Sequence, residues 1–319
     1  MKPDLLEVLA CPRCGEPLHP EGETTLVCST HAYPIVDGVP DMLLGRESTP
    51  SREAFSQQWR FRYAGAFERE NRVFWLGVDD SVQYLQAKVF AAAAPGEWLL
   101  DAGCGSGEKA IALAKANPQA KVLALDFSDT VGDLARLAWD VPNLHVVRGD
   151  VSNPPLRAGA FARIVSIGVL HHTPDAKAAF DAVARLAAPD AQFAVWLYPD
   201  PNESPAFQKI YYFVRDVLFL GQGHAMTPEV RLLALRLLCL PVFALLPLFT
   251  LSQAINQELY RDMSIEDLYR GLVFLLYDDL APQYQSRHSR AEVEGWYHAN
   301  GFPRVEQPEL GLFAGYRQA

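Results

Sequence analysis

Basic residues are scarce in this chain of 319 residues. Lysine and arginine number 28 against 38 aspartates and glutamates, which gives a formal net charge of −10 at pH 7 and a pI near 5.3. Lysine and arginine do not gather into runs anywhere in the sequence. A broad phosphate-binding surface needs such clusters, so the charge argues against a nucleic acid as the substrate.

Cysteine is also rare. Of the five cysteines, three lie near the start of the chain, whereas Cys104 and Cys239 stand alone. This uneven, odd-numbered set is not the disulfide framework of a secreted protein. The opening residues, "MKPDLLEVLACPRC", lack the long apolar stretch of a secretory signal. We therefore expect a reduced, cytoplasmic protein.

The first forty residues contain the spacing of a metal site. The pattern is C-x2-C-x13-C-x2-H, formed by Cys11, Cys14, Cys28 and His31. Two such knuckles can place four ligands at the corners of a tetrahedron around Zn²⁺, which accepts thiolate and imidazole alike. The alternative is a β-hairpin with reduced thiols and no metal, and His19 is an alternative fourth ligand.

The sequence segments that contain this pattern resemble a known family. "LLEVLACPRCGEPL" and "LVCSTHAYPIVDGVPDML", from Leu5 to Leu44, are similar to the Trm112-type zinc ribbons. The family's ribbon is either a separate activator of a methyltransferase or fused to one. The resemblance thus implies a structural rather than catalytic zinc and a protein partner for the ribbon. His31 stands where the family usually has its last cysteine.

A second pattern begins at "EWLLDAGCGSGEKA". An apolar strand, a glycine-rich turn and the helical "EKAIALAKAN" form the first βα unit of a doubly wound sheet, and "AKVLALD" is the second strand. The glycines are Gly103, Gly105 and Gly107. Position 108, where a dinucleotide fingerprint needs its third glycine, is Glu108. The pattern therefore does not predict a dinucleotide site.

The charges around the turn favour a different ligand. Asp101 and Glu108 flank it and would repel a pyrophosphate at the helix N-terminus. S-adenosylmethionine has no phosphate but carries an ammonium, a carboxylate and a sulfonium. Asp126, which ends the second strand, is placed for the ribose hydroxyls, Phe127 for the adenine ring and Asp150 for the adenine amine.

These segments carry a second resemblance. "DAGCGSG", "ALDFS", "RGDV" and "SIGVLHH" are similar to the successive strand ends of class I S-adenosylmethionine-dependent methyltransferases, more narrowly the methyltransferase type 11 group. The resemblance implies an α/β fold, a doubly wound sheet of seven strands. The cofactor residues it implies are Asp101, Gly103, Cys104, Gly105, Gly107, Asp126, Phe127, Asp150, Val151 and Gly168.

We divide the chain accordingly. The predicted parts are a zinc ribbon (1–48), an N-terminal helical segment (49–94), a cofactor-binding Rossmann-like core (95–198), a helical lid insertion (199–287), and the last helix with a C-terminal hairpin (288–319). The insertion holds a largely apolar stretch of 20 residues with a single charge, 232–251. It is interpreted as a lid over an apolar pocket, with a peripheral membrane contact and a membrane span as alternatives.

Methyl transfer mainly requires alignment of the nucleophile with the sulfonium and exclusion of water, and a phenol or carbon acid additionally requires a base. The candidate catalytic residues are His171, His172, Tyr284 and His288, with Asp279 and Arg287 on the same rim. We expect methylation of a small or medium, partly apolar metabolite. The alternatives are a membrane-surface lipid or quinone methyltransferase, an RNA methyltransferase, and a non-catalytic cofactor-binding partner protein.

Overall fold

The computed structural model describes residues 1–44, 49–65, 85, 90, 93–203, 227–237, 240 and 265–318. Most of the predicted apolar stretch 232–251 lies outside these residues, as do parts of the insertion 199–287 and most of 66–94. Among the described helices, none is both long and apolar enough to cross a membrane.

The N-terminal region forms a small antiparallel sheet, which we call the ribbon (residues 1–44). It begins with a short 3-10 helix, η1 (Pro3–Glu7), and its sheet contains β1 (His19–Glu21), β2 (Thr25–Val27), β3 (Ala32–Val36) and β4 (Val39–Pro40) in sequential order. The turn between β3 and β4 is Asp37–Gly38, and both residues have positive φ, 51° and 79°. Two-residue hairpin turns of this kind match the twist of the flanking strands.

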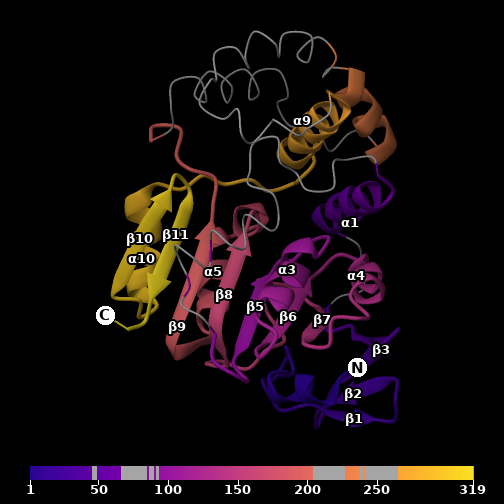
Figure 1. Cartoon of the computed structure of the whole chain (residues 1–319), viewed down its shortest axis with the longest axis vertical. Helices are drawn as coiled ribbons and strands as arrows, with labels where there is room; N and C mark the ends of the chain where they lie inside the picture. Colours follow the sequence, from indigo (N-terminus) through magenta and orange to yellow (C-terminus); the bar gives the residue numbers. More distant parts are fainter. Residues whose placement is uncertain are drawn as a thin grey trace.

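The central sheet has seven strands, which confirms the predicted fold class. Their order is β10-β11-β9-β8-β5-β6-β7, and only the β10–β11 and β11–β9 pairings are antiparallel (Figure 1). The strands are β5 (Trp98–Ala102), β6 (Lys121–Asp126), β7 (Leu144–Arg148), β8 (Phe161–Ile167), β9 (Ala187–Trp196), β10 (Arg304–Glu309) and β11 (Leu312–Tyr316). The parallel strands are almost continuously apolar because helices cover both faces of the sheet.

The helices connect these strands as a doubly wound fold requires. They are α3 (Glu108–Ala116), α4 (Val131–Leu137), η2 (Leu170–His172), α5 (Ala176–Ala184) and α10 (Arg290–Ala299). The Ser289 hydroxyl accepts a hydrogen bond from the Glu292 N–H (3.3 Å) and thereby caps α10. Residues Pro189–Gln192 lie within β9, where the pairing with β8 is irregular. That bulge accommodates Pro189, which has no N–H to donate.

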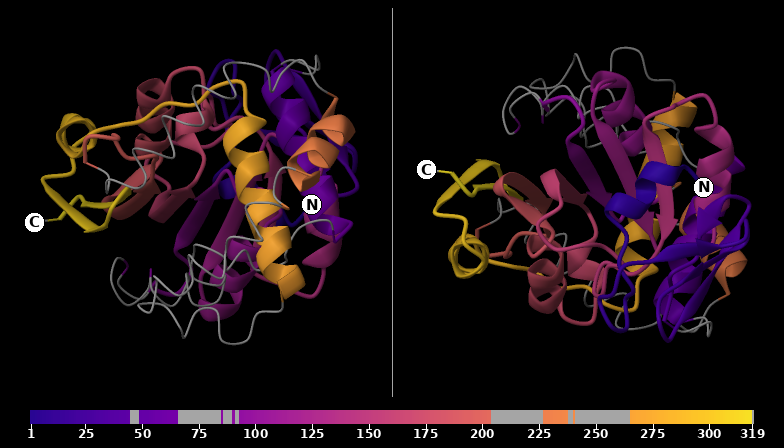
Figure 2. Two further views of the ribbon diagram at one scale, coloured as in Figure 1. Left: turned by 90° about the horizontal axis from the view of Figure 1, so that it is seen from above. Right: turned by 90° about the horizontal axis from the view of Figure 1, so that it is seen from below.

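Three helices cover the carboxyl ends of the parallel strands. They are α1 (Pro50–Tyr63), the helical residues 228–237 and α9 (Ile265–Leu280), which lie side by side in Figure 2. Their shared apolar cluster includes Ala54, Leu232, Leu235, Phe274 and Tyr277. The Thr49 hydroxyl caps α1 by accepting from the Arg52 N–H, and Pro50 occupies the first turn, where no N–H is needed.

The ribbon lies at the opposite end of the sheet and shares its core. Leu5, Val8, Leu9 and Leu26 belong to the same buried cluster as Trp98 and other strand residues. The apolar side chains of the ribbon therefore pack against the sheet.

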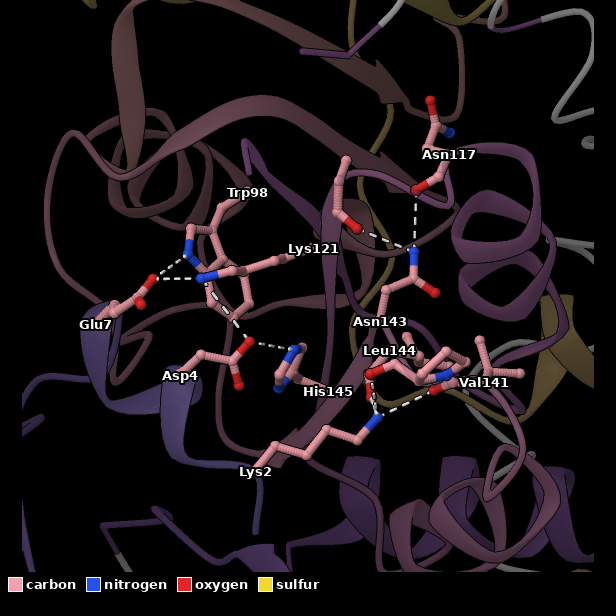
Figure 3. A network of polar contacts seen from close by, with 12 residues as sticks. Lys2, Asp4, Glu7, Trp98, Asn117, Lys121, Val141, Asn143, Leu144 and His145 are labelled. Atoms are coloured by element: carbon pink, nitrogen blue, oxygen red, sulfur yellow. Dashed lines mark hydrogen bonds and ion pairs between the residues drawn. The ribbon is translucent and has the colours of Figure 1, made fainter. Parts of the chain in front are cut away.

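Polar contacts reinforce this docking (Figure 3). The Glu7 carboxylate accepts from the Trp98 indole N–H (3.2 Å) and from the Lys121 ammonium (2.7 Å). The Lys2 ammonium donates to three carbonyl oxygens, those of Val141, Pro142 and Leu144. After β4, Asp41 forms an isolated parallel β-bridge with Arg148 of β7, so the ribbon also covers an edge strand of the sheet.

Candidate functional site

The four predicted metal ligands meet in the ribbon. The ligand atoms of Cys11, Cys14, Cys28 and His31 all lie within 4.8 Å of one another. The Nδ1 atom of His31 is 3.6 Å from the sulfur of Cys11 and 3.6 Å from that of Cys28, and the sulfurs of Cys14 and Cys28 are also 3.6 Å apart. Zn²⁺ with bonds of about 2.3 Å to sulfur and about 2.0 Å to nitrogen places tetrahedral ligands roughly 3.5 to 3.8 Å apart. The cluster therefore fits zinc.

The backbone explains how this cluster forms. The Gly15 N–H donates to the Cys11 carbonyl oxygen (2.8 Å), and Gly15 has a positive φ of 75°, which turns the first knuckle back on itself. In the second knuckle the Cys28 N–H donates to the His31 carbonyl oxygen (2.9 Å). Through Glu7 the ribbon contacts the amino ends of β5 and β6, whereas the glycine turn follows the carboxyl end of β5 (Figure 1). The first knuckle also contacts the loop after β7, because the Pro12 carbonyl oxygen accepts from the Asn153 side-chain amide (3.0 Å).

The glycine turn follows β5 directly. Gly103, Gly105 and Gly107 have φ values of 86°, 56° and 81°, which side-chain-bearing residues rarely adopt. A Cβ on Gly103 would lie 2.4 Å from Val169, and one on Gly107 would lie 2.2 Å from Leu134. These positions need glycine both for conformation and for close packing against the loop after β8 and against α4.

The acids around the turn are buried. Asp126 is 5% exposed, and its two carboxylate oxygens accept from the backbone N–H groups of Gly105 and Ser128, each at 2.8 Å. Asp126 therefore braces the turn, and its carboxylate oxygens keep lone pairs for a further hydrogen bond. Burial raises its pKa, against the hydrogen bonds from Ser128 and Gly105, which lower it.

Asp101 is the most unusual of these acids. It is 3% exposed, and within the described part of the chain its Oδ2 atom has no hydrogen-bond partner. Burial raises its pKa to about 6, although the Lys109 charge opposes this. A buried carboxylate oxygen without a donor is costly unless a ligand supplies one, so this geometry fits a cationic ligand group.

The other predicted cofactor residues lie on the neighbouring strand ends. Phe127, half-buried, is 6.0 Å by ring centroid from Phe55 of α1. Asp150 is exposed and its carboxylate accepts from the Ser152 N–H (2.8 Å), while Val151 beside it is buried. Gly168 has a φ of 79° and open space where a Cβ would be. The backbone N–H of Cys104 donates to the Leu125 carbonyl oxygen (3.0 Å), which holds the turn against β6.

Helix α1 lies directly on the glycine turn. A Cβ on Gly105 would be 2.5 Å from the Trp59 ring, so this indole packs on the backbone of the turn. The Tyr63 hydroxyl donates to the Ser106 carbonyl oxygen (2.8 Å), and the Arg62 guanidinium donates to Glu108 (2.8 Å). Arg60 forms an ion pair with Asp129 at the next strand end. These contacts make α1 a cover for the predicted cofactor site.

Two of the predicted catalytic histidines lie next to this cover. His171 is fully buried, 4.0 Å by ring centroid from Tyr198 and 4.2 Å from His172, and in the described chain its ring nitrogens have no hydrogen-bond partner. The Nδ1 atom of His172 is 3.1 Å from the Tyr284 carbonyl oxygen, and its ring is 5.3 Å from Phe55. Burial lowers the pKa of both histidines.

The other two predicted catalytic residues are placed differently. In the described structure both ring nitrogens of His288 have partners, the Ser286 hydroxyl at 2.8 Å and the Glu292 carboxylate at 3.1 Å. Tyr284 is 37% exposed and contributes its carbonyl oxygen to His172. On the rim, Asp279 accepts from the Gln285 side chain (2.6 Å), and the positive charge of Arg287 lowers the pKa of His171.

The structure adds residues that we did not predict. The Gln58 amide donates to one oxygen of Asp278 (2.8 Å), and the Tyr198 hydroxyl donates to the other (3.3 Å). Asp278 thus connects α1, α9 and the segment after β9, next to His172. Only the aromatic and polar composition of these segments hinted at such a role, because no local motif links residues this far apart.

Two family models match the chain. A methyltransferase domain matches residues 99–190, and a Trm112p-like protein matches residues 2–38. The chain is 30% identical over 118 residues to a probable tRNA methyltransferase 9B of Mus musculus, covering 36% of this chain and 25% of that protein. It is 31% identical over 140 residues to a demethylmenaquinone methyltransferase of Lactobacillus johnsonii, covering 42% of this chain and 57% of that protein.

The ribbon has its own relative. A UPF0434 protein of Burkholderia thailandensis is 45% identical over 64 residues, which is 18% of this chain and 94% of that protein. The chain thus spans a quarter to about half of the methyltransferases above but nearly all of this small protein. The chain therefore contains a methyltransferase domain, matched over residues 99–190, and an N-terminal Trm112p-like domain, matched over residues 2–38.

Proposed function

We propose that the protein transfers the methyl group of S-adenosylmethionine to a small or medium, partly apolar metabolite. The observation that carries the proposal is the buried, acid-lined glycine turn. The Oδ2 atom of Asp101, which finds no donor in the described chain, suits the ammonium of the methionine moiety. The braced carboxylate of Asp126 suits the ribose hydroxyls, and Phe127 suits the adenine ring.

The chain's own contribution to the reaction is alignment and exclusion of water. The donor carries an activated sulfonium, so an acceptor held in line with the methyl group can displace the thioether. Trp59 on the glycine turn and Phe55 beside Phe127 supply an apolar cover. Such a cover suits an acceptor with apolar surface, since water is removed from both when the acceptor binds.

Binding of the donor is the first test. Calorimetry on the full chain should show a micromolar affinity for S-adenosylmethionine, which corresponds to about 8 kcal/mol, and no binding of NAD. Asp126→Asn should weaken donor binding, whereas Asp140→Asn, which changes an exposed acid in the turn between α4 and β7, should not. Binding of NAD with no response to the methyl donor would exclude the proposal. Donor binding without transfer of labelled methyl to any component of a metabolite extract would favour a non-catalytic role.

One observation favours an acceptor at a membrane surface as a second candidate. Residues Val230, Leu233, Leu237 and Leu240 are each more than half exposed and follow helical spacing, while Leu232 and Leu235 face α9. Leu233, Leu237 and Leu240 belong to the stretch 232–251, for which a peripheral membrane contact was one of the alternatives, and Val230 directly precedes it. Co-sedimentation with vesicles of anionic lipid should be lost in Leu233→Asp/Leu237→Asp, and equal sedimentation of both proteins would refute this contact.

We also propose that the ribbon holds a structural zinc and that its protein partner is the chain's own methyltransferase domain. The fit of the four ligands to a tetrahedron and the docking of Glu7 and Lys2 onto the sheet support this. In the described part of the chain the cysteines form no disulfide, which suits a reducing compartment such as the cytoplasm.

A further inference from the structure

We propose that His172, oriented by the Tyr284 carbonyl and assisted by Asp278, is the general base of the reaction, and that the acceptor is an aromatic or conjugated molecule with a weakly acidic hydroxyl, a phenol or an enol. This inference rests on the proposed methyl transfer. It goes further by naming the base and the chemical class of the acceptor.

The tautomer of His172 follows from its partner. A backbone carbonyl oxygen can only accept, so the Nδ1 atom of His172, 3.1 Å away, must carry the hydrogen when the ring is neutral. The lone pair then lies on Nε2. In the described structure Nε2 is buried and has no hydrogen-bond partner. A histidine held in this way presents a proton acceptor and nothing else.

The surroundings keep the ring neutral yet able to accept a proton. Burial lowers the pKa of His172, whereas the charges of Asp278 and Asp279 and the bond to Tyr284 raise it. The other groups that face the ring are the buried His171 and the ring of Tyr198. Imidazolium formed during the reaction is therefore stabilised by Asp278, which Gln58 and Tyr198 hold in place. Asp278 acts through His172 and is a positioning residue.

The nearby side chains favour an aromatic acceptor. The His172 ring lies among Phe55 at 5.3 Å and Tyr198 at 5.4 Å, and Phe55 continues to Phe127 at 6.0 Å, by ring centroid. A carboxylate or a neutral amine is nucleophilic as it stands and needs no base. A hydroxyl becomes a good nucleophile only when a base removes its proton. A base with a fixed lone pair among aromatic rings thus matches a phenol or enol.

The reaction couples removal of the hydroxyl proton to transfer of the methyl group. The Nε2 lone pair takes the hydroxyl proton, and the electrons of the O–H bond remain on the acceptor as an oxyanion or enolate. This nucleophile forms the bond to the donor's methyl carbon while the carbon–sulfur bond breaks, and its electrons remain on sulfur as a neutral thioether. The products are the methylated acceptor, S-adenosylhomocysteine and an imidazolium that returns its proton to water.

The test uses the full chain, labelled S-adenosylmethionine and four probes: 4-methylphenol, 4-nitrophenol, aniline and benzoate. His172→Asn keeps a donor for the Tyr284 carbonyl but removes the base. We expect it to lower transfer to 4-methylphenol by about 100-fold or more, and to affect 4-nitrophenol much less because that phenol is largely ionised at mildly alkaline pH. The matched control is His298→Asn on α10, since Nδ1 of His298 also lies 3.1 Å from a backbone carbonyl oxygen, that of Phe302 beyond the end of the helix.

Asp278→Asn gives a readout that a purely structural role would not move. The rate should fall, and the acid limb of the rate–pH profile should shift to lower pH because the variant loses the charge that raises the pKa of His172. An unchanged profile, equal losses for the two phenols in His172→Asn, or transfer to aniline or benzoate but to neither phenol would each overturn the inference.

Nitrogen NMR of the histidine rings, recorded with S-adenosylhomocysteine bound, decides the matter if no probe is methylated. A hydrogen on Nδ1 of His172 and a bare Nε2 support the inference, and the reverse tautomer refutes it. Donor calorimetry and labelled-methyl transfer to a metabolite extract, measured with the same protein, separate this failure from failure of the proposed function. Loss of donor binding, or binding without any transfer, counts against the proposed function, whereas the reverse tautomer in a protein that binds the donor and transfers methyl counts only against the assignment of His172.

Discussion

Replacing Asp101 by asparagine should make the protein more stable and its donor site weaker. The side chain is 3% exposed, and in the described chain its Oδ2 atom has no hydrogen-bond partner. Burial raises its pKa from 3.8 to about 6. The folded state therefore resists ionisation of this group, and asparagine has nearly the same shape without the charge.

The size and pH range of the stability effect follow from this shift. A rise of roughly two in the pKa of Asp101 corresponds by linkage to about 3 kcal/mol of unfolding free energy. Because the folded pKa is raised, the cost of the ionised group is absent below pH 3.8, grows as pH rises, and is fully present above about pH 6. Asp101→Asn should thus be more stable than the natural protein at neutral pH by up to about 3 kcal/mol, and this advantage should vanish in acid.

Donor binding should change in the opposite direction. A charge-assisted hydrogen bond contributes roughly 2 kcal/mol or more, so the variant should bind S-adenosylmethionine at least about tenfold more weakly. In the natural protein the affinity should also fall below about pH 6, as Asp101 becomes protonated. In the variant it should be nearly independent of pH in that range.

Two measurements check these effects. Urea unfolding followed by tryptophan fluorescence, with six tryptophans in the chain, gives the stability at several pH values, and calorimetry gives the donor affinity. The exposed Asp140→Asn is the control. A variant that is less stable than the natural protein at neutral pH, or that keeps the natural donor affinity, would refute the assignment of Asp101 to the ammonium.

Two further results are expected. Metal analysis should find one zinc per chain, which is lost in Cys28→Ser but kept in His19→Ala, because the His19 side chain is exposed outside the cluster. Since the ribbon shares its core with the sheet, removal of zinc by a chelator should lower the melting temperature of the whole protein. An unchanged melting temperature after zinc removal would contradict this coupling. Gly107→Ala should destabilise the protein by about 2 kcal/mol or more, because the position has a φ of 81° and the new Cβ would lie 2.2 Å from Leu134. Gly159→Ala, with a φ of 72° and open space around the Cβ, should cost only the free energy of the positive φ. Equal unfolding free energies for the two variants would show that Leu134 moves aside freely.

Much of this architecture could be predicted from short signals in the sequence. The spacing of three cysteines and His31 predicted a cluster that the structure forms, since two tight knuckles bring their ligands together by local backbone turns. The glycine turn and Asp126 could likewise be placed, because a parallel strand, a turn and a helix restrict where each side chain lies. The terminal hairpin of β10 and β11 followed from alternation and turn residues.

Only the tertiary structure decided which distant residues meet. Gln58 and Asp278 are 220 positions apart, and His172 and Tyr284 are 112 apart, yet each pair is joined by a hydrogen bond. His288, which the sequence placed among the catalytic candidates, forms hydrogen bonds with Ser286 and Glu292 that no local motif predicted. Sequence patterns indicate local backbone preference and burial. Contacts between distant residues depend instead on how α1, α9 and the ribbon pack against the two ends of the sheet, and this arrangement is fixed by the packing of the complete apolar core.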